Sequence, residues 1–247
     1  MATKEIEYKN SNFRLSYNII NPKNDEVLLV LHGWGSNKEI MKQAFGKSLC
    51  EYRHIYLDLA GFGKSNNDII LTTEDYANIV RLFLKQLNVS ITIAMGHSFG
   101  GKVSTLLNPP YLVLLSSSGV LVPKVASVRF KIALFKFLKP LKLDRLHQLF
   151  VSDDAKGMSH EMYETFKNVV NEDFEENFSK NSSKKALCFW GRDDTATPLW
   201  SGEKISSLLS NSKFYPLEGD HFFFLKHTEF ISQTISKEFQ NNQNKEN

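Results

Sequence analysis

The sequence predicts an α/β protein with a mostly parallel, eight-stranded sheet flanked by helices. Short apolar segments rich in β-branched residues alternate along the chain with longer segments whose apolar residues recur at helical spacing. One short segment, Val27–Leu31, is apolar at every position, which is typical of a strand buried on both faces of a parallel sheet. The composition agrees, because 42% hydrophobic and 12% aromatic residues in a chain of 247 can fill the core of one large domain.

The order of these segments predicts the individual elements. We expect the first two strands to form an antiparallel pair and helices to connect the later, parallel ones. The expected strands are Glu5–Tyr8, Phe13–Asn18, Val27–Leu31, His54–Leu57, Ile91–Met95, Leu112–Leu115, Ala186–Trp190 and Lys213–Leu217. The expected helices are Lys38–Leu49, Thr73–Leu87 with Thr72 or Thr73 as its cap, Gly101–Leu107, Ser201–Leu209 and a terminal helix from about Lys226.

The alternation of strands and helices stops after Gly119. From Val120 to Ser183 no strand signal appears, and the segment is predicted to form several helices inserted after the sixth strand. We therefore expect a core made of residues 1–119 and 184–247. The insertion at 120–183 should lie over the carboxyl edge of the sheet, where ligands bind in open α/β sheets.

Composition and charge argue against several classes of function. A formal net charge of +3 is too small to imply nucleic-acid binding. The N-terminal residues lack the apolar region of a signal peptide, and no apolar run approaches the ~18 residues of a membrane span, so we expect a cytoplasmic protein. Cys50 and Cys188 are far apart without metal or redox spacing, and we expect two buried thiols and no metal or cofactor.

A short glycine-rich segment is the most informative part of the chain. Gly96-His97-Ser98-Phe99-Gly100 has the pattern G-x-S-x-G and lies between an expected strand and an expected helix. In that context the pattern is typical of a nucleophile elbow, a sharp turn that presents a serine at the top of a sheet. The flanking glycines permit close backbone approach, and the following helix directs N–H groups towards developing negative charge.

Four further motifs follow the same order as in a known family. His32–Gly35 follows the third expected strand, and Asp58–Ser65 has the pattern D-x-A-G-x-G-x-S, with Ala60 where a proline is usual. Trp190–Pro198 has the pattern W-G-x-x-D-x-x-x-P, and Gly219–His221 has the pattern G-x-H. Together with the serine motif, they resemble the α/β-hydrolase fold family over nearly the whole chain. The resemblance implies a serine hydrolase with a compact helical cap at the insertion.

The resemblance implies a catalytic triad in the order Ser, Asp, His. A serine hydroxyl is a poor nucleophile at neutral pH, so His221 is expected to take the proton of Ser98 as it attacks. Asp194 is expected to hold the other ring nitrogen, because its position in the acid loop fits the family's register. Asp193 is the competing candidate, one residue out of register.

The resemblance also implies an oxyanion hole and a substrate pocket. The backbone N–H groups of Phe99 and Trp34 are expected to stabilise the tetrahedral intermediate. The pocket residues are expected in the elbow, the histidine loop and the cap; they are His97, Phe135, Leu138 and Phe222.

The first half of the expected cap is both apolar and basic. Lysine and arginine residues are interspersed with aromatic and aliphatic ones over Val125–Leu146. This segment can be interpreted as the solvated faces of ordinary cap helices. A more specific hypothesis is that this segment contacts an acidic partner, such as an acyl carrier protein, or an anionic membrane surface.

These inferences predict a carboxylic-ester hydrolase that acts through an acyl-enzyme on a small or medium acyl substrate. One alternative is a carbon–carbon hydrolase of 2-hydroxy-6-oxo-dienoates. Against it, Gly96-His97-Ser98, Gly33-Trp34-Gly35-Ser36 and His221-Phe222 depart from the motifs usual in those enzymes. The alternative of another class is a non-catalytic protein that binds a small molecule or an acyl carrier on the same scaffold.

Overall fold

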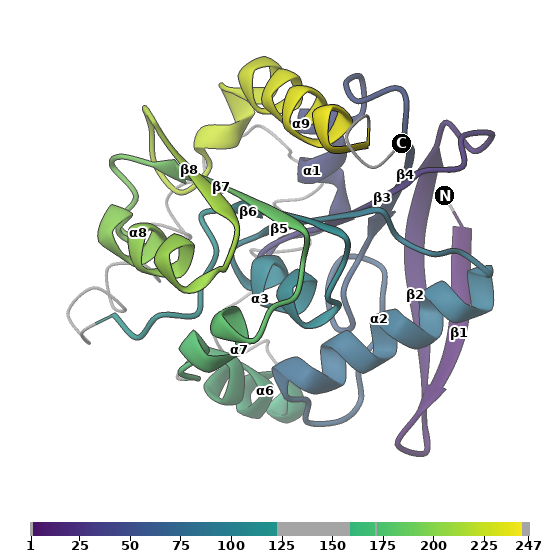
Figure 1. Cartoon of the computed structure of the whole chain (residues 1–247). Helices are drawn as coiled ribbons and strands as arrows, with labels where there is room; N and C mark the ends of the chain where they lie inside the picture. Colours follow the sequence, from purple (N-terminus) through teal and green to yellow (C-terminus); the bar gives the residue numbers. More distant parts are fainter. Residues whose placement is uncertain (1, 123–158, 171, 244–247) are drawn as a thin grey trace.

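The structure, a computed structural model, describes residues 2–122, 159–170 and 172–243. Its centre is an eight-stranded sheet with helices on both faces (Figure 1). The strands are β1 (Ala2–Tyr8), β2 (Ser11–Ile20), β3 (Val27–Leu31), β4 (Arg53–Leu57), β5 (Ile93–His97), β6 (Tyr111–Leu115), β7 (Lys185–Gly191) and β8 (Ser212–Leu217). Across the sheet they follow the order β1-β2-β4-β3-β5-β6-β7-β8.

The sheet is mostly parallel, as the sequence predicts. β1 pairs antiparallel with β2, and β2 pairs antiparallel with β4. Every pairing from β4 through β3, β5, β6 and β7 to β8 is parallel. All five residues of β3 are buried, because successive side chains point to opposite faces and both faces are covered. The expected fold class is therefore confirmed.

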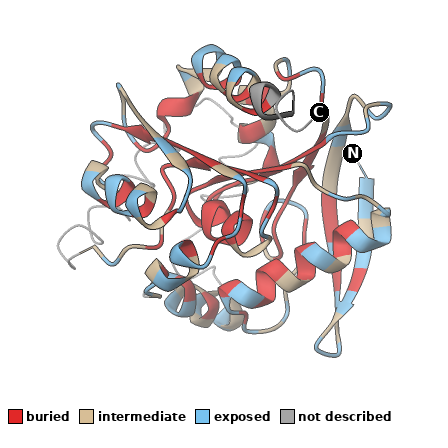
Figure 2. Ribbon diagram, viewed as in Figure 1, coloured by how far each residue is buried: buried red, intermediate tan, exposed pale blue. Residues whose placement is uncertain are grey.

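Helices form a layer on each face of this sheet. The helices are α1 (Lys38–Phe45), α2 (Thr73–Leu87), α3 (Phe99–Leu106), α6 (His160–Val170), α7 (Glu175–Ser179), α8 (Leu199–Leu208) and α9 (Thr228–Gln243), with a 3₁₀ turn at Phe223–Leu225. Side chains of α1 and α9 pack on one face, and those of α2, α3, α7 and α8 pack on the other. Figure 2 shows that buried residues line the central strands and the inward sides of these helices.

Helix α2 has the predicted bounds because its caps are local. The Thr72 hydroxyl accepts from the Asp75 N–H at 3.2 Å, while the Asp75 carboxylate accepts from the Thr72 N–H at 2.9 Å. This reciprocal capping box fixes the first turn. Asn88 ends the helix in the left-handed conformation at φ 52°.

The described part of the insertion contains α6 and α7, both helical as expected. Helix α6 is attached to the core at its C-terminal end, where the buried Lys102 ammonium on α3 donates to the Val169 carbonyl at 2.8 Å. The same ammonium forms an ion pair of 2.5 Å with Glu172, which also accepts from the Thr73 hydroxyl. The pocket candidates Phe135 and Leu138, and the basic segment 125–146, lie outside the described residues.

Two expectations about local structure are wrong. The helix expected over Lys38–Leu49 ends at Phe45, because Gly46 caps it and Leu49 adopts a left-handed turn at φ 52°. Cys50 is exposed rather than buried. Cys188 is buried as expected, and burial raises the pKa of its thiol to about 12.

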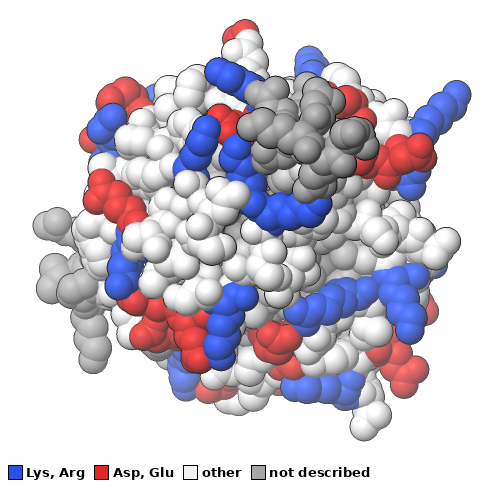
Figure 3. All heavy atoms as spheres, in the orientation of Figure 1, with Lys and Arg blue, Asp and Glu red and all other residues white. Residues whose placement is uncertain are grey.

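The charged surface is mixed in sign. On the face drawn in Figure 3, lysines and arginines alternate with aspartates and glutamates instead of forming one large field. Among the described helices, none combines the length and apolar character needed to cross a bilayer.

Candidate active site

Ser98 occupies a strained turn between β5 and α3. Its backbone has φ 51° and ψ −116°, a region that residues with a side chain rarely adopt. Three backbone hydrogen bonds hold it there: the Ser98 N–H donates to Leu115 O at 3.1 Å, while Ser98 O accepts from the N–H groups of Gly101 and Ser118. Such strain persists only where the surrounding structure enforces it, and it is common at functional sites.

The glycines of the elbow are required by close backbone contacts. A Cβ at Gly96 would lie 2.2 Å from Gly100 O, and a Cβ at Gly100 would lie 2.6 Å from His32 O. Neither neighbour is a flexible side-chain end, so a side chain at either position would force the turn open. The G-x-S-x-G pattern therefore has a direct steric cause in this structure.

The loop after β3 lies against the serine. A Cβ at Gly33 would lie 3.1 Å from Ser98 Cβ, so the backbone of this loop passes directly beside the serine side chain. The next residue, Trp34, is buried and packs its ring edge-on against Phe99 at 5.5 Å. The two expected oxyanion-hole residues are thus in contact, one in this loop and one at the first position of α3.

His32 and Asp58 fix the residues at the two ends of that loop. The His32 ring accepts from the Leu59 N–H at Nε2 and therefore donates from Nδ1 to Gly33 O at 2.8 Å. Burial lowers the pKa of His32, which keeps this neutral form. Asp58 is buried and forms an ion pair of 2.5 Å with the buried ammonium of Lys38, a structural role for the first residue of its motif.

His221 and Asp194 form a buried hydrogen-bonded pair. His221 Nδ1 lies 2.8 Å from Asp194 Oδ2, and the aspartate side chain is 0% exposed. Burial by itself raises the pKa of Asp194, but His221 and the hydrogen bonds donated to the carboxylate outweigh it and hold that pKa below its usual value. The carboxylate is therefore ionised, with one oxygen directed at the imidazole.

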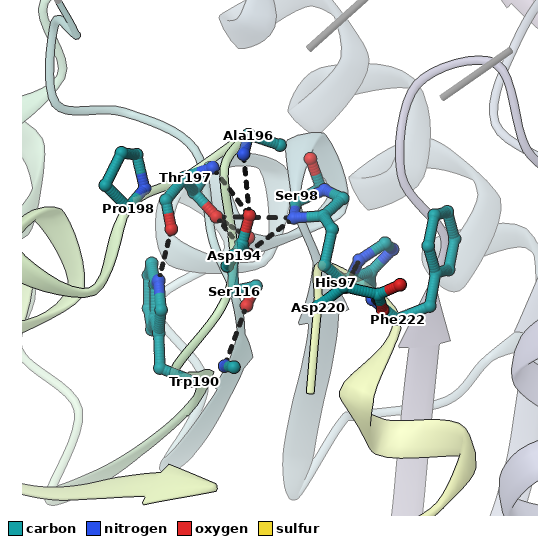
Figure 4. A network of polar contacts seen from close by, with 12 residues as sticks. His97, Ser98, Ser116, Trp190, Asp194, Ala196, Thr197, Pro198, Asp220 and Phe222 are labelled. Atoms are coloured by element: carbon teal, nitrogen blue, oxygen red, sulfur yellow. Dashed lines mark hydrogen bonds and ion pairs between the residues drawn. The ribbon is translucent and has the colours of Figure 1, made fainter. Parts of the chain in front are cut away.

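The rest of the acid loop surrounds the carboxylate with donors. Asp194 Oδ1 accepts from the N–H groups of Ala196 at 2.8 Å and Thr197 at 2.9 Å, and Oδ2 accepts from the Thr197 hydroxyl at 2.8 Å. Figure 4 shows these contacts converging on Asp194 from the segment that ends at Pro198. Together with His221, these donors fix the orientation of the carboxylate.

The two neighbouring aspartates have other contacts. Asp193 is exposed, and its backbone N–H donates to Gly219 O at 2.9 Å. Asp220 is also exposed, and its carboxylate accepts from the Phe222 N–H at 2.9 Å. Of Asp193 and Asp194, the residue that contacts the His221 ring is Asp194.

His97 and Phe222, expected as pocket residues, pack around His221. His97 Nε2 donates to the His221 carbonyl at 2.9 Å, and the two imidazole rings lie 4.6 Å apart between centroids. Phe222 contacts both rings and, like His97, is almost fully buried. Burial lowers the pKa of His97 well below its usual value, so this ring is neutral. These contacts link the elbow to the histidine loop.

Sequence reasoning assigned no role to Thr197 or Ser116. Thr197 immediately precedes the motif proline, and Ser116 follows β6 in a left-handed conformation at φ 44°. The Thr197 hydroxyl lies 3.2 Å from Ser116 O and 3.3 Å from His221 Nδ1. The acid-loop motif points to Thr197 by position, whereas nothing in the sequence marks Ser116.

Comparison with known proteins is consistent with this fold. Residues 26–108 match the model of the alpha/beta hydrolase fold family. The chain is 27% identical to an uncharacterized hydrolase, YugF, of Bacillus subtilis (strain 168), with 85% of this chain and 89% of that protein covered.

Two solved structures are similar in fold. A bacterial membrane phospholipase A has a TM-score of 0.82 at 20% identity, with 98% of this chain and 87% of that chain covered. An esterase from Exiguobacterium antarcticum has a TM-score of 0.74 at 20% identity, with 92% and 96% covered. At these identities the likeness is one of fold.

Proposed function

Since the chain belongs to the α/β-hydrolase fold family and is a hydrolase of that fold, we propose that it is a serine esterase. Ser98 is the nucleophile, His221 the general base and Asp194 the residue that orients the base. The observation that carries the proposal is the buried His221–Asp194 pair, joined through His97 to the strained turn that presents Ser98. Its substrates are carboxylic esters with a small to medium acyl group.

The first half of the reaction forms an acyl-enzyme. The Ser98 oxygen attacks the ester carbonyl carbon while His221 takes the hydroxyl proton, and the carbonyl electrons move onto oxygen. The N–H groups of Phe99 and Trp34 donate to that oxyanion. The carbon–oxygen bond to the alcohol then breaks, and the alcohol leaves with the proton held by His221.

The second half releases the acid. Water attacks the acyl carbon while His221 takes one of its protons, which gives a second tetrahedral intermediate at the same oxyanion donors. Its collapse breaks the bond to Ser98, which recovers a proton from His221, and the carboxylic acid departs. Asp194 stays ionised throughout and stabilises the imidazolium that forms twice in each cycle.

Aromatic side chains near the expected oxyanion donors support an apolar acyl group. The Trp34 ring packs against Phe62 at 4.8 Å and against Phe166 of α6 at 5.3 Å between ring centroids. Phe62 is buried, whereas Phe166 is partly exposed. The methylenes of an acyl chain beside these rings would be removed from water. Each methylene covered would favour binding by ~0.8 kcal/mol.

The test is a series of p-nitrophenyl esters of increasing acyl length, measured beside a 2-hydroxy-6-oxo-dienoate. We expect ester hydrolysis and labelling by a fluorophosphonate, both abolished in Ser98→Ala while the far-ultraviolet circular dichroism stays unchanged. Ser104→Ala is the matched control, because Ser104 is a fully buried serine of α3 whose hydroxyl has no hydrogen-bond partner among the described residues.

Other results identify the alternatives. Cleavage of the dienoate in preference to every ester would assign a carbon–carbon hydrolase. A wild-type protein that is folded but neither labelled nor active on any activated ester would contradict the hydrolytic mechanism and leave a binding function.

A further inference from the structure

We propose that Thr197 is a positioning residue, whose hydroxyl holds the Asp194 carboxylate in the orientation that receives the ring N–H of His221. This inference rests on the proposed function of the same site. Thr197 is separate from the reacting atoms, because its hydroxyl contacts Asp194 and the Nδ1 side of His221, the side that faces the acid.

The hydroxyl lies between two acceptor oxygens and the ring N–H of His221. Thr197 Oγ1 is 2.8 Å from Asp194 Oδ2, 3.2 Å from Ser116 O and 3.3 Å from His221 Nδ1. A hydroxyl has only one proton to donate. Of these three atoms the carboxylate oxygen is the nearest and carries the charge, so it takes the proton, since hydrogen bonds to ionised acceptors are about twice as strong as neutral ones.

The backbone of Thr197 is fixed independently of its side chain. Its N–H donates to Asp194 Oδ1 at 2.9 Å, and its carbonyl accepts from the buried indole N–H of Trp190 at 2.7 Å (Figure 4). The residue itself is 6% exposed. Removing the hydroxyl therefore leaves the loop anchored on both sides of the residue, and the change is confined to one oxygen of the carboxylate.

That oxygen is the one that matters for His221. Asp194 Oδ1 is held by two backbone N–H groups, whereas Oδ2 accepts from the Thr197 hydroxyl and faces the imidazole. Without that hydroxyl, Oδ2 loses a donor that is fixed by the loop. The orientation of the carboxylate then depends more on its contact with His221. The carboxylate then gains freedom to rotate out of the plane in which it orients the base.

The test compares Thr197→Val, which keeps the shape but removes the hydroxyl, with Thr197→Ser, which keeps the hydroxyl. We expect kcat for p-nitrophenyl esters to fall about 10-fold in Thr197→Val, the size of a lost hydrogen bond to a charged group, with KM unchanged. Thr197→Ser should retain most of the wild-type kcat. Thr195→Val is the loop control, because Thr195 is exposed.

A second measurement tests the contact between Asp194 and His221 without requiring catalysis. In protein labelled with ¹⁵N-histidine, the downfield proton resonance of the His221 Nδ1–H should be present at the same position in wild type and Thr197→Ser. In Thr197→Val it should shift or broaden, because the acceptor oxygen is no longer held in place.

The outcomes separate this inference from the proposed function. Wild-type kcat and an unshifted resonance in Thr197→Val, in an enzyme that Ser98→Ala abolishes, would overturn the role of Thr197 alone. Equal losses in Thr197→Val and Thr197→Ser would assign the residue a packing role and overturn it as well. If wild type hydrolyses no ester, the proposed function fails, and the resonance still decides whether Thr197 holds Asp194.

Discussion

At the scale of single residues, the most consequential feature is an ionised carboxylate in the interior. A buried carboxylate without partners is strongly destabilised. Here Asp194 is compensated by two backbone N–H groups, the Thr197 hydroxyl and the His221 ring. The same contacts that compensate the charge also orient it, so that stability and the proposed catalytic geometry depend on one set of atoms.

The first prediction concerns the choice between adjacent aspartates. Asp194→Asn should lower kcat by about 10⁴, because an amide at this position favours the wrong imidazole tautomer. Asp193→Asn should change kcat less than about twofold, since that side chain is exposed and its loop contact is made by the backbone. Steady-state kinetics on one ester, with thermal unfolding to verify folding, measures both. The reverse ranking would move the acid of the proposed triad to Asp193.

Sequence alone could select Asp194 as the candidate acid that contacts His221, but not the residues around it. The motif fixes the spacing of Asp194 from Gly191 and Pro198, and that spacing selects one aspartate of two. Thr197 and Ser116 belong to segments 81 residues apart, and their contact depends on the pairing of β6 with β7. A motif describes spacing along the chain, so contacts of this kind do not appear in it.

At the scale of elements, the attachment of α6 to α3 rests on a buried lysine. Lys102 is 1% exposed, and its ammonium is satisfied by the Val169 carbonyl and the Glu172 carboxylate. Burial lowers the pKa of Lys102, while the neighbouring Glu172 opposes that shift. Glu172 is thus the counter-charge of the lysine, and the contacts of Lys102 with Glu172 and Val169 hold the end of α6 against the helix that follows the serine.

The second prediction tests this attachment. Glu172→Gln should lower the free energy of unfolding by about 1–3 kcal/mol, because it leaves the buried ammonium without its counter-charge. It should also raise KM for longer acyl esters more than for acetate, since α6 carries Phe166 against Trp34.

The control for this prediction is Glu176→Gln. Glu176 is exposed on α7 and pairs with the exposed Lys180, so its loss should change the free energy of unfolding by less than about 0.5 kcal/mol. Equal effects of the two substitutions would show that the Lys102–Glu172 pair has no special part in holding α6.

The bounds of elements were predictable where their signals are local. Helix α2 begins and ends as predicted because Thr72, Asp75 and Asn88 act within their own turns. Helix α1 ends four residues early, because Gly46 caps it by donating to the Lys42 carbonyl and Leu49 then adopts a left-handed conformation. Nothing in the sequence marks the apolar Leu49 as a turn residue, and its carbonyl contacts the His54 ring of β4.

At the scale of the whole molecule, three buried histidines make stability depend on pH. Burial lowers the pKa values of His32, His54 and His97 below 6.5. Below that pH the unfolded chain binds protons that the folded chain does not. The free energy of unfolding therefore decreases as pH falls from about 7 towards the folded-state pKa values. Each histidine contributes a slope of at most ~1.4 kcal/mol per pH unit, the value for one proton bound by the unfolded chain alone.

The third prediction isolates one of these histidines. Urea unfolding at pH 7, 6 and 5 should show a steady loss of stability in wild type and a shallower loss in His54→Gln. That variant should be less stable at pH 7, because His54 bonds to Leu49 O and the Tyr56 hydroxyl. His160→Gln, at an exposed position, should keep the wild-type slope. A slope unaffected by His54→Gln would contradict the prediction.

The contact between Lys102 and Val169 also bears on the order in which the chain folds. The last carbonyls of a helix have no partner within it, and at Val169 the partner is supplied by another helix. An isolated helix as short as α6, with 11 residues, is marginal in water. Helix α6 thus depends on α3 for a hydrogen bond of its final turn, whereas α3 packs mostly against β3, β5, β6 and α2. The sheet and α3 can assemble first, and the inserted helix acquires a stable end only by docking on them.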